Sequence, residues 1–420
     1  MTRTELSAAA EWRAHWPTVV AAMAGLSFAS MSIYSIGLFI EPLMHEFHWT
    51  SAQVVAGLSA VALLAVPLSP FVGGMIDRWG SRRLAIPGVT LAACGFAAFG
   101  FANGSPTQWM VLWVVYACFA LLVKATVWTA AVASVFNAGR GLALAVALSG
   151  AALAQAIGPL SAQWLIDSHG WRHAFVWMGL GWGGVVLLLV LPFFFDAHDH
   201  LRRASGATKS PGVPPTLTGL TLREAMRNPP IVRIAMALSL ATFLGVGVTV
   251  HKVPILSEVG ISRHSAAEIA ASAGIAGICG KLLTGWLLDR WRTGWISGIC
   301  MALPAIAFAL LLDPIRTPTL AVCSMIIFGY SGGAYLQICT YLTSRYGGVR
   351  HFGKIFGVMA SLMALGSALG PLAAGVIFDH FGNYWWVLVG GVPLGLCCGL
   401  LVAGLGPYPD WNAVSSTTHS

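Results

Sequence analysis

The stretch GGMIDRW at residues 73–79 returns as TGWLLDRW at residues 284–291, and this repetition decides the fold. The spacing is constant at 212 residues and also holds for pairs far from these two stretches. A constant spacing over such a distance indicates a duplicated unit of about half the chain. The recurring pairs include Gly73 and Gly285, Asp77 and Asp289, Arg78 and Arg290, Gly158 and Gly370, and Gly170 and Gly382.

The composition indicates that most of this chain is surrounded by lipid. Of its 420 residues, 57% are hydrophobic and 9% are charged, whereas a soluble domain carries about a quarter charged residues. The apolar runs are continuous rather than alternating, which favours helices over barrel strands. We predict an all-α membrane protein with twelve transmembrane helices, six per repeat, near 16–40, 52–76, 84–102, 108–135, 141–165, 173–195, 231–257, 265–288, 295–312, 318–344, 355–378 and 384–405.

Basic residues predict the orientation of these helices, because short cytoplasmic loops retain Lys and Arg. The predicted loops place 17 of the 23 Lys and Arg residues on one side and four on the other. We therefore expect a multi-pass protein of an inner (plasma) membrane of bacterial type, with both termini in the cytoplasm. The predicted domains are an N-terminal six-helix bundle at 1–195, a cytoplasmic linker at 196–230, a C-terminal six-helix bundle at 231–405 and a cytoplasmic tail at 406–420.

Two parallel six-helix repeats joined by a cytoplasmic linker are the plan of secondary transporters. In such proteins the substrate binds near the midplane of the membrane, and the halves rock to give alternating access. The basic excess is explained by the loops and does not indicate nucleic-acid binding. All eight cysteines fall inside predicted helices, so we expect neither disulfides nor a metal site.

Several stretches carry a family resemblance. The string GGMIDRWGSRR (73–83) resembles the signature loop of the major facilitator superfamily, and 285–292 resembles its second copy. Within that superfamily the chain is most similar to the monocarboxylate and oxalate/formate transporter branch, from about Trp16 to Val402. The stretches that carry this likeness are YSIGLFIEPLMHEFHWT (34–50), RGLALAVALSGAALAQAIGPL (140–160), IDSHGWRHAF (166–175), VHKVPILSEVGIS (250–262) and YLTSRYGGVRHFGKIFG (341–357).

The two signature loops predict a gate on the cytoplasmic side. Asp77 stands at the end of the second predicted helix beside arginines, where it can pair with arginine and with the N-terminus of a neighbouring helix. A merely solvated loop is the alternative, but the recurrence in the second repeat favours gating. The predicted gating residues are Gly73, Asp77, Arg78, Arg82, Arg83, Gly285, Asp289 and Arg290.

Two lysines lie within predicted helices, where a charge is costly. A lysine at a helix centre costs about 2.5–3.5 kcal/mol on insertion scales, so such residues usually face a pathway. No Asp or Glu lies deep in any predicted span, so the two cations Lys124 and Lys281 indicate an anionic substrate. The resemblance implies that Lys281 replaces an arginine that binds the substrate carboxylate. Lys281 snorkelling to the surface, and Lys124 bound to helix-terminal carbonyls, remain alternatives.

Polar and aromatic residues near these lysines are candidates to complete the pocket. Trp128 follows Lys124 by one helical turn and can form a wall for an apolar body. Tyrosine and glutamine donate hydrogen bonds to carboxylates without adding charge, although each is equally suited to bridging helices. With Lys281, Lys124 and Trp128, the predicted substrate-binding residues are Tyr34, Tyr335, Gln155 and Gln337.

Coupling to protons stays open at this stage. The resemblance implies an acidic residue one turn before Lys281, but the chain has Gly277 there, and a lysine that some relatives carry on the first helix is Tyr34 here. His251 is the candidate titrating group near neutral pH, with a gate or interface role as the alternative. The expected partners are a small organic anion, protons or a counter-anion, and the lipid bilayer, and we expect a monomer.

Other functions are less consistent with the residues. An efflux pump for drug-like or cationic compounds is the main alternative, and it predicts an acidic residue deep in the cavity. An enzyme would need a metal set or a nucleophile with its base, and a receptor would need an output domain. No GxxxxGK[ST] loop is present, so ATP does not drive the process directly. We expect no enzymatic activity, no cofactor and no nucleic-acid partner.

Overall fold

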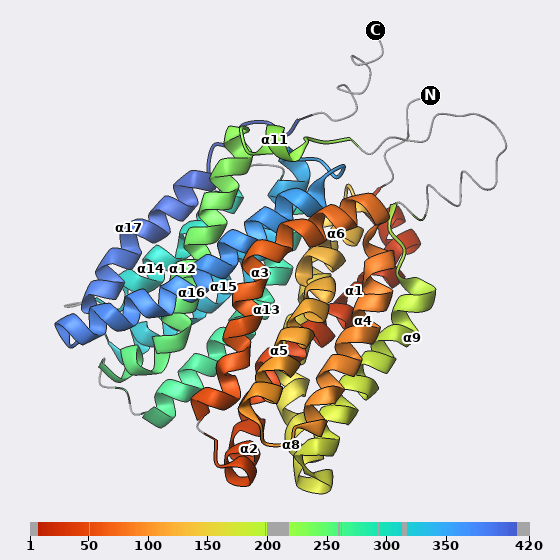
Figure 1. Cartoon of the computed structure of the whole chain (residues 1–420). Coiled ribbons are helices and arrows are strands. Elements are labelled where there is room, and N and C mark those ends of the chain that lie inside the picture. Colours follow the sequence, from red (N-terminus) through yellow and green to blue (C-terminus); the bar gives the residue numbers. More distant parts are fainter. Residues whose placement is uncertain are drawn as a thin grey trace, which may run out of the picture. The chain divides into compact units, whose positions relative to one another are not determined.

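The computed structural model of this chain is almost wholly helical in the residues that it describes, which are 7–49, 51–197, 199, 218–258, 261, 263–291, 294–312 and 317–409. The elements of the first repeat are α1 (Ala8–Ser35), η1 (Ile36–Phe39), α2 (Ile40–Phe47), α3 (Ser51–Trp79), α4 (Ser81–Ala98), η2 (Phe99–Phe101), α5 (Pro106–Ala120), η3 (Leu121–Val123), α6 (Ala125–Val135), α7 (Arg140–Leu148), α8 (Gly150–Val176), η4 (Trp177–Trp182) and α9 (Gly183–Phe193). The later elements are α11 (Leu222–Ala225), α12 (Pro229–Glu258), α13 (Arg263–Arg290), α14 (Gly294–Ala309), α15 (Pro318–Tyr346), α16 (Phe352–Phe381) and α17 (Trp385–Val402) (Figure 1).

All of the predicted spans fall on helical segments. Within the described residues, nine runs are long and apolar enough to cross a membrane. One of these, Arg140–Phe193, has 54 residues and contains two predicted spans, while α14 is shorter than the others with 16 residues. The all-helical membrane architecture is thus confirmed, and the count of twelve spans stays a prediction. Most of the predicted linker at 196–230, and the tail beyond 409, lie outside the described residues.

The chain divides into two compact units that are not simple halves of the sequence. Unit 1 comprises Met1–Gly139, Val146–Leu217 and Val349–Ala360, and unit 2 comprises Arg140–Ala145, Thr218–Gly348 and Ser361–Ser420. Each unit therefore holds one repeat together with a short segment of the other. Within unit 1, α4 packs beside α5 and α9, and within unit 2, α14 packs beside α15 and α17 (Figure 1).

Glycines bring the first and fifth helices of each repeat into close contact. In unit 1, the missing side chain of Gly158 on α8 makes room for the Ser35 hydroxyl of α1. In unit 2, Gly370 on α16 packs in the same way against backbone atoms of Phe243 and Gly247 on α12. Small residues permit such approaches in lipid, where packing rather than the hydrophobic effect joins helices. The small-residue pattern of the sequence thus has a packing role in both repeats.

Two repeat-related glycines interrupt the helical conformation between the fifth and sixth predicted helices of each repeat. Gly170 has a φ of 79° within α8, and Gly382 has a φ of 72° directly after α16. Both lie in the left-handed region that favours glycine, because other residues meet a steric penalty there. The duplication is therefore visible in the backbone as well as in the sequence.

The packing of α13 against α15 gives a first testable prediction. A Cβ added at Gly333 would collide with the carbonyl of Gly277, whereas one added at Gly332 would meet no atom within 4 Å. We expect Gly333→Ala to destabilise the protein by about 1–3 kcal/mol through overpacking, and Gly332→Ala to change its stability much less. The thermal unfolding of the two purified variants checks this. Equal losses in both variants would contradict the close helix contact.

Candidate functional site

Asp77 holds the first turn of a helix that belongs to the other repeat. Its carboxylate accepts hydrogen bonds from the backbone N–H of Gly353 at 2.7 Å and of Lys354 at 2.9 Å. These residues open α16, so the negative charge also faces the positive end of that helix dipole. All three residues lie in unit 1. We call this contact the Asp77 clamp.

Asp289 makes the same contact with the roles of the repeats exchanged. Its carboxylate accepts from the backbone N–H of Gly141 at 2.7 Å and of Leu142 at 2.8 Å, in the first turn of α7. Gly141 and Leu142 precede Gly353 and Lys354 by the same 212 positions that separate the two aspartates. This contact lies within unit 2 and is called the Asp289 clamp.

The repeated glycines of the signature explain how close these contacts are. A Cβ at Gly73 would collide with the backbone of Gly353, and a Cβ at Gly285 would lie 2.8 Å from the carbonyl oxygen of Gly141. Each aspartate stands one helical turn beyond its glycine, so a side chain at the glycine would push the facing helix away from the carboxylate. The spacing Gly-x-x-x-Asp is therefore the spacing that each clamp requires.

The signature arginines make contacts of their own. Arg82 donates to the carbonyl oxygens of Phe194 at 2.8 Å and Leu191 at 2.7 Å, and its guanidinium stacks on Phe195. It thereby caps the end of α9 within unit 1. Arg78 and Arg290 each stack over a nearby tryptophan, Trp79 and Trp286 respectively. The hydrogen bonds of the Asp77 carboxylate thus come from the backbone amides of a helix N-terminus, and within the described residues the predicted pairing of Asp77 with arginine is not present.

Lys281 lies on α13, one turn before Gly285, and is half-buried. The helix approaches α15 closely here, because a Cβ at Gly280 would collide with the carbonyl of Tyr330. Thr284 shares the face of Lys281 at a spacing of three residues, and its hydroxyl lies 3.0 Å from that of Tyr330. Lys281 and Thr284 thus lie on one face of α13, where the Thr284 hydroxyl meets that of Tyr330 on α15.

Lys124 lies at a break in its helix rather than in a continuous span. It follows η3, takes an extended conformation with φ −63° and ψ 163°, and is the N-cap residue of α6. The backbone of Lys124 therefore adjoins the first turn of α6, whose backbone N–H groups face the break. Trp128 spans the break, since its indole N–H donates to the Val123 carbonyl at 2.7 Å. Trp128 is completely buried and fills the space left by Gly25.

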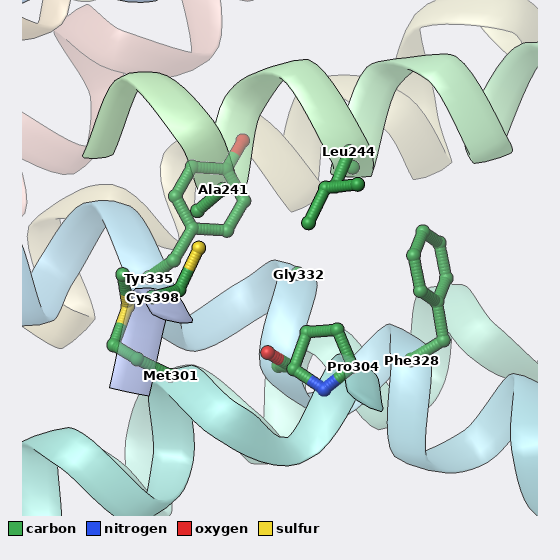
Figure 2. A pocket seen from close by; sticks show the side chains of 10 residues that line it. Ala241, Leu244, Met301, Pro304, Phe328, Gly332, Tyr335 and Cys398 are labelled. Atoms are coloured by element: carbon green, nitrogen blue, oxygen red, sulfur yellow. The ribbon is translucent and has the colours of Figure 1, made fainter. Parts of the chain in front are cut away.

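The remaining polar candidates occupy different surroundings. Tyr34 and Gln155 are exposed, on α1 and α8. Tyr335 lines a cavity of unit 2 with Leu244 and Met301, and its ring reaches toward α12 (Figure 2). His251 Nδ1 lies 2.9 Å from the carbonyl oxygen of Gly247 on the same helix. The side-chain amide of Gln337 donates a hydrogen bond to the carbonyl oxygen of Gly141 at 3.1 Å.

Gln337 therefore lies beside the Asp289 clamp. Two further residues there, Arg140 and Ser344, are not among the gating residues predicted from the sequence. Arg140 donates to the hydroxyl of Ser344 at 3.2 Å beside the same turn of α7.

A third overlooked residue is Glu11 in unit 1, whose buried carboxylate accepts from the backbone N–H groups of Asn137, Ala138 and Gly139. Glu11 precedes the first predicted span at 16–40, where a carboxylate looks like an ordinary surface residue, so no sequence signal marks it.

Comparison with known proteins decides the family. The model of the major facilitator superfamily matches residues 20–371 and, in a second match, 246–416. The chain belongs to the major facilitator superfamily. Its solved structural relatives agree with this assignment. The Escherichia coli fucose:proton symporter aligns with a TM-score of 0.67 at 16% identity over 91% of this chain and 97% of that one. The human organic anion transporter MFSD10 aligns with a TM-score of 0.68 at 17% identity over 92% and 99%.

Curated relatives narrow the likeness within this superfamily. Mouse monocarboxylate transporter 11 is 28% identical over 394 residues, which cover 88% of this chain and 83% of the relative. Bovine monocarboxylate transporter 13 is 25% identical over 389 residues, covering 88% and 84%. The predicted resemblance to the monocarboxylate branch is thereby confirmed. Family and relatives are transporters, so the prediction of a transporter rather than an enzyme is confirmed as well.

Proposed function

We propose that this protein is a secondary transporter that moves small organic anions of the monocarboxylate type, including aromatic or dicarboxylic acids, by alternating access. The observation that carries this proposal is the pair of lysines, Lys124 and Lys281, on helices of an otherwise apolar membrane domain. A cation in such a place usually serves a pathway, and its natural ligand is an anion. The names of the curated relatives support a carboxylate as that anion.

Each lysine has surroundings suited to an anion. Lys281 offers its charge beside the hydroxyl groups of Thr284 and Tyr330, which can donate hydrogen bonds to carboxylate oxygens. Lys124 offers its charge beside the N-terminus of α6, where the helix dipole also favours an anion. Discontinuous helices with such N-termini are a recurring device of secondary transporters. Tyr34, Tyr335 and Gln155 complete the proposed substrate-binding set.

The two clamps supply the proposed gate. Asp77 and Asp289 each join one repeat to a helix of the other, so the repeats cannot separate at these helix ends while both clamps hold. We assign these ends to the cytoplasmic side, from the excess of basic residues in the neighbouring loops. His251 is the proposed proton-coupling residue, and protons or a counter-anion are the proposed coupling partners.

A ligand panel tests the proposed substrate class. A bound substrate raises thermal stability by mass action, by about 2.7 kcal/mol at a hundredfold excess over Kd. We expect the purified protein to be stabilised by one or more members of a panel of mono-, di- and aromatic carboxylates, and not by matched amides or amines. Stabilisation by cationic or neutral compounds alone would overturn the organic-anion assignment and favour an efflux pump.

A further inference from the structure

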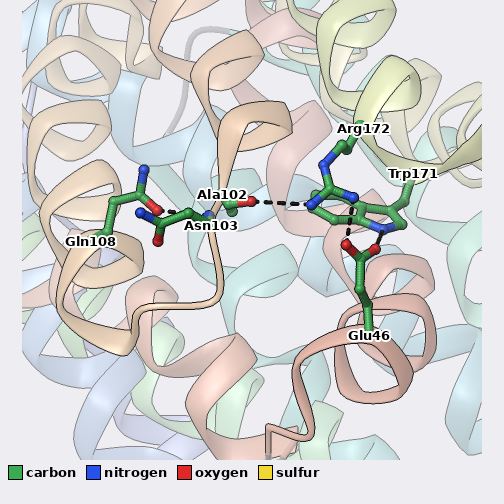
Figure 3. Close-up of polar contacts among 6 residues, drawn as sticks. All are labelled: Glu46, Ala102, Asn103, Gln108, Trp171 and Arg172. Atoms are coloured by element: carbon green, nitrogen blue, oxygen red, sulfur yellow. Dashed lines mark hydrogen bonds and ion pairs between the residues drawn. The ribbon is translucent and has the colours of Figure 1, made fainter.

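A second carboxylate contact lies at the opposite end of α3 from Asp77. Glu46, on α2, accepts from the indole N–H of Trp171 at 2.7 Å and from the guanidinium of Arg172 at 2.6 Å (Figure 3). Arg172 also donates to the carbonyl of Ala102 at 3.3 Å and stacks over the Trp171 ring. Through Glu46 and Arg172, this contact joins the segment after the first predicted span to the start of the sixth span. The bond to Ala102 joins these two segments to the end of the third span. We call this contact the Glu46 tie.

The second repeat has a carboxylate tie at the equivalent place. Glu258, the last residue of α12, accepts from the backbone N–H of Tyr384 at 3.1 Å, directly before α17. Glu258 follows Glu46 by 212 positions, and Tyr384 follows Arg172 by the same number. Each unit therefore contains a tie from the segment that ends its first predicted span to the start of its sixth. We call the second contact the Glu258 tie.

The two ties use different donors, which makes them distinguishable by substitution. The Glu46 tie depends on a charged guanidinium and an indole, whereas the Glu258 tie depends on a backbone amide. A glutamine can still accept one hydrogen bond but cannot form an ion pair. Glutamine is therefore expected to weaken the Glu46 tie strongly and the Glu258 tie only slightly.

The Glu258 tie anchors the helix that carries His251, and the Glu46 tie anchors α2, which follows the helix that carries Tyr34. Tyr34 lies at the end of α1, and the chain then narrows into the 3₁₀ turn η1 before it reaches α2 and Glu46. A 3₁₀ stretch between α-helical segments often marks a hinge, so α1 alone does not fix the position of α2. His251 lies two turns before Glu258 on α12, and its ring lies 5.3 Å from that of Tyr384.

We infer that Glu46 and Glu258 are repeat-related positioning residues for transport. Glu46 holds α2, which follows the helix that carries Tyr34, and Glu258 holds the end of the helix that carries His251, each against the start of the sixth helix of the same repeat. Alternating access moves each bundle as a body, and these ties keep that end of each bundle together while the Asp77 and Asp289 clamps open. The inference rests on the proposed alternating-access transport, but the ties themselves are intrinsic to each unit.

The Glu46 tie keeps its charge across the physiological range of pH. Burial raises the pKa of the Glu46 carboxyl. Hydrogen bonds from Arg172 and Trp171, together with the charge of Arg172, lower this pKa by a larger amount, so the net pKa is below the ordinary 4.5. A lowered pKa means that the stabilisation is present at neutral pH and is lost only as the pH falls through the folded-state value. The ion pair therefore persists between pH 7 and pH 5.

Hydrogen exchange of the full-length protein tests the inference without any substrate. We expect Glu46→Gln to accelerate amide exchange in 36–49 and 169–176 by about fivefold or more, because a local contact no longer opposes opening. The reversed pair Glu46→Arg with Arg172→Glu is expected to restore part of the protection, because it re-forms the ion pair but not the indole hydrogen bond. Asp167→Asn is the control, since Asp167 is exposed and accepts only from Gln163 on its own helix.

Hydrogen exchange of two Glu258 variants tests the Glu258 tie in the same way. We expect Glu258→Leu to accelerate exchange in the first turn of α17, and Glu258→Gln to leave it close to wild type. Uptake into proteoliposomes of the carboxylate that stabilises the protein most is expected to fall in Glu46→Gln and in Glu258→Leu. This uptake is expected to recover when positions 46 and 172 carry the reversed pair. Unchanged exchange in Glu46→Gln, or no recovery in the reversed pair, would overturn the inference. Because exchange is measured without ligand, failure of the organic-anion assignment would leave this result standing.

Discussion

Lys281→Ala is expected to abolish both the stabilisation by carboxylates and their transport, while leaving the fold intact. Removing one partner of a buried, hydrogen-bonded charge pair costs about 2–5 kcal/mol, which is roughly a 30-fold or greater loss of affinity. Lys281 shares a face of α13 with Thr284, whose hydroxyl lies 3.0 Å from that of Tyr330, so its removal leaves only neutral donors for the anion. Thermal shift with the best ligand of the panel, followed by uptake into proteoliposomes, measures the effect.

Two further variants show whether the charge itself is responsible. Lys281→Arg keeps the charge and adds a planar fork that can hold a carboxylate at two points, so we expect binding to be retained or tightened. Lys252→Ala removes a lysine from α12 outside the proposed site and is expected to bind as wild type does. If Lys281→Ala binds carboxylates as tightly as the control, Lys281 is not the anion site and its charge has a structural role.

The sequence predicted the clamps better than it predicted the pocket. The repeated Gly-x-x-x-Asp spacing indicated an aspartate facing a helix N-terminus, and both aspartates have that contact. The identity of the helix was not predictable, because Asp77 and Gly353 are brought together only by packing across the whole chain. Glu46 and Glu258 obey the same 212-residue spacing, so the repeat itself contains the signal for the two ties.

Side-chain surroundings were harder to predict than helices. Nothing in the residues around Lys124 marks a break, since neither glycine nor proline stands there, yet the backbone is extended at this lysine. Periodicity places Gln337 and Trp128 on helices but does not distinguish a face that lines a pocket from one that packs on a neighbour. Both side chains are completely buried, the first beside the Asp289 clamp and the second across the break at Lys124.

The clamps lead to a prediction about conformational balance. Asp77→Asn and Asp289→Asn each replace a carboxyl group that accepts two backbone N–H bonds, and hydrogen bonds to the charged form of such a group contribute about 1.5–3 kcal/mol. Asparagine keeps one acceptor, so we expect each substitution to weaken its clamp by about 1–2 kcal/mol, or roughly tenfold in the closed-to-open ratio. Amide exchange in the first turn of α16 measures the Asp77 clamp, and exchange in the first turn of α7 measures the Asp289 clamp.

The two variants are controls for each other. The Asp77 clamp lies in unit 1 and the Asp289 clamp in unit 2, so each substitution should accelerate exchange at its own helix N-terminus first. If both clamps close the same side of the transporter, opening requires both to break, and the double variant should favour the open state by about the sum of the two effects, roughly a hundredfold. A double variant no more open than either single one would mean that one clamp alone holds the gate, and that the other serves only to cap its helix.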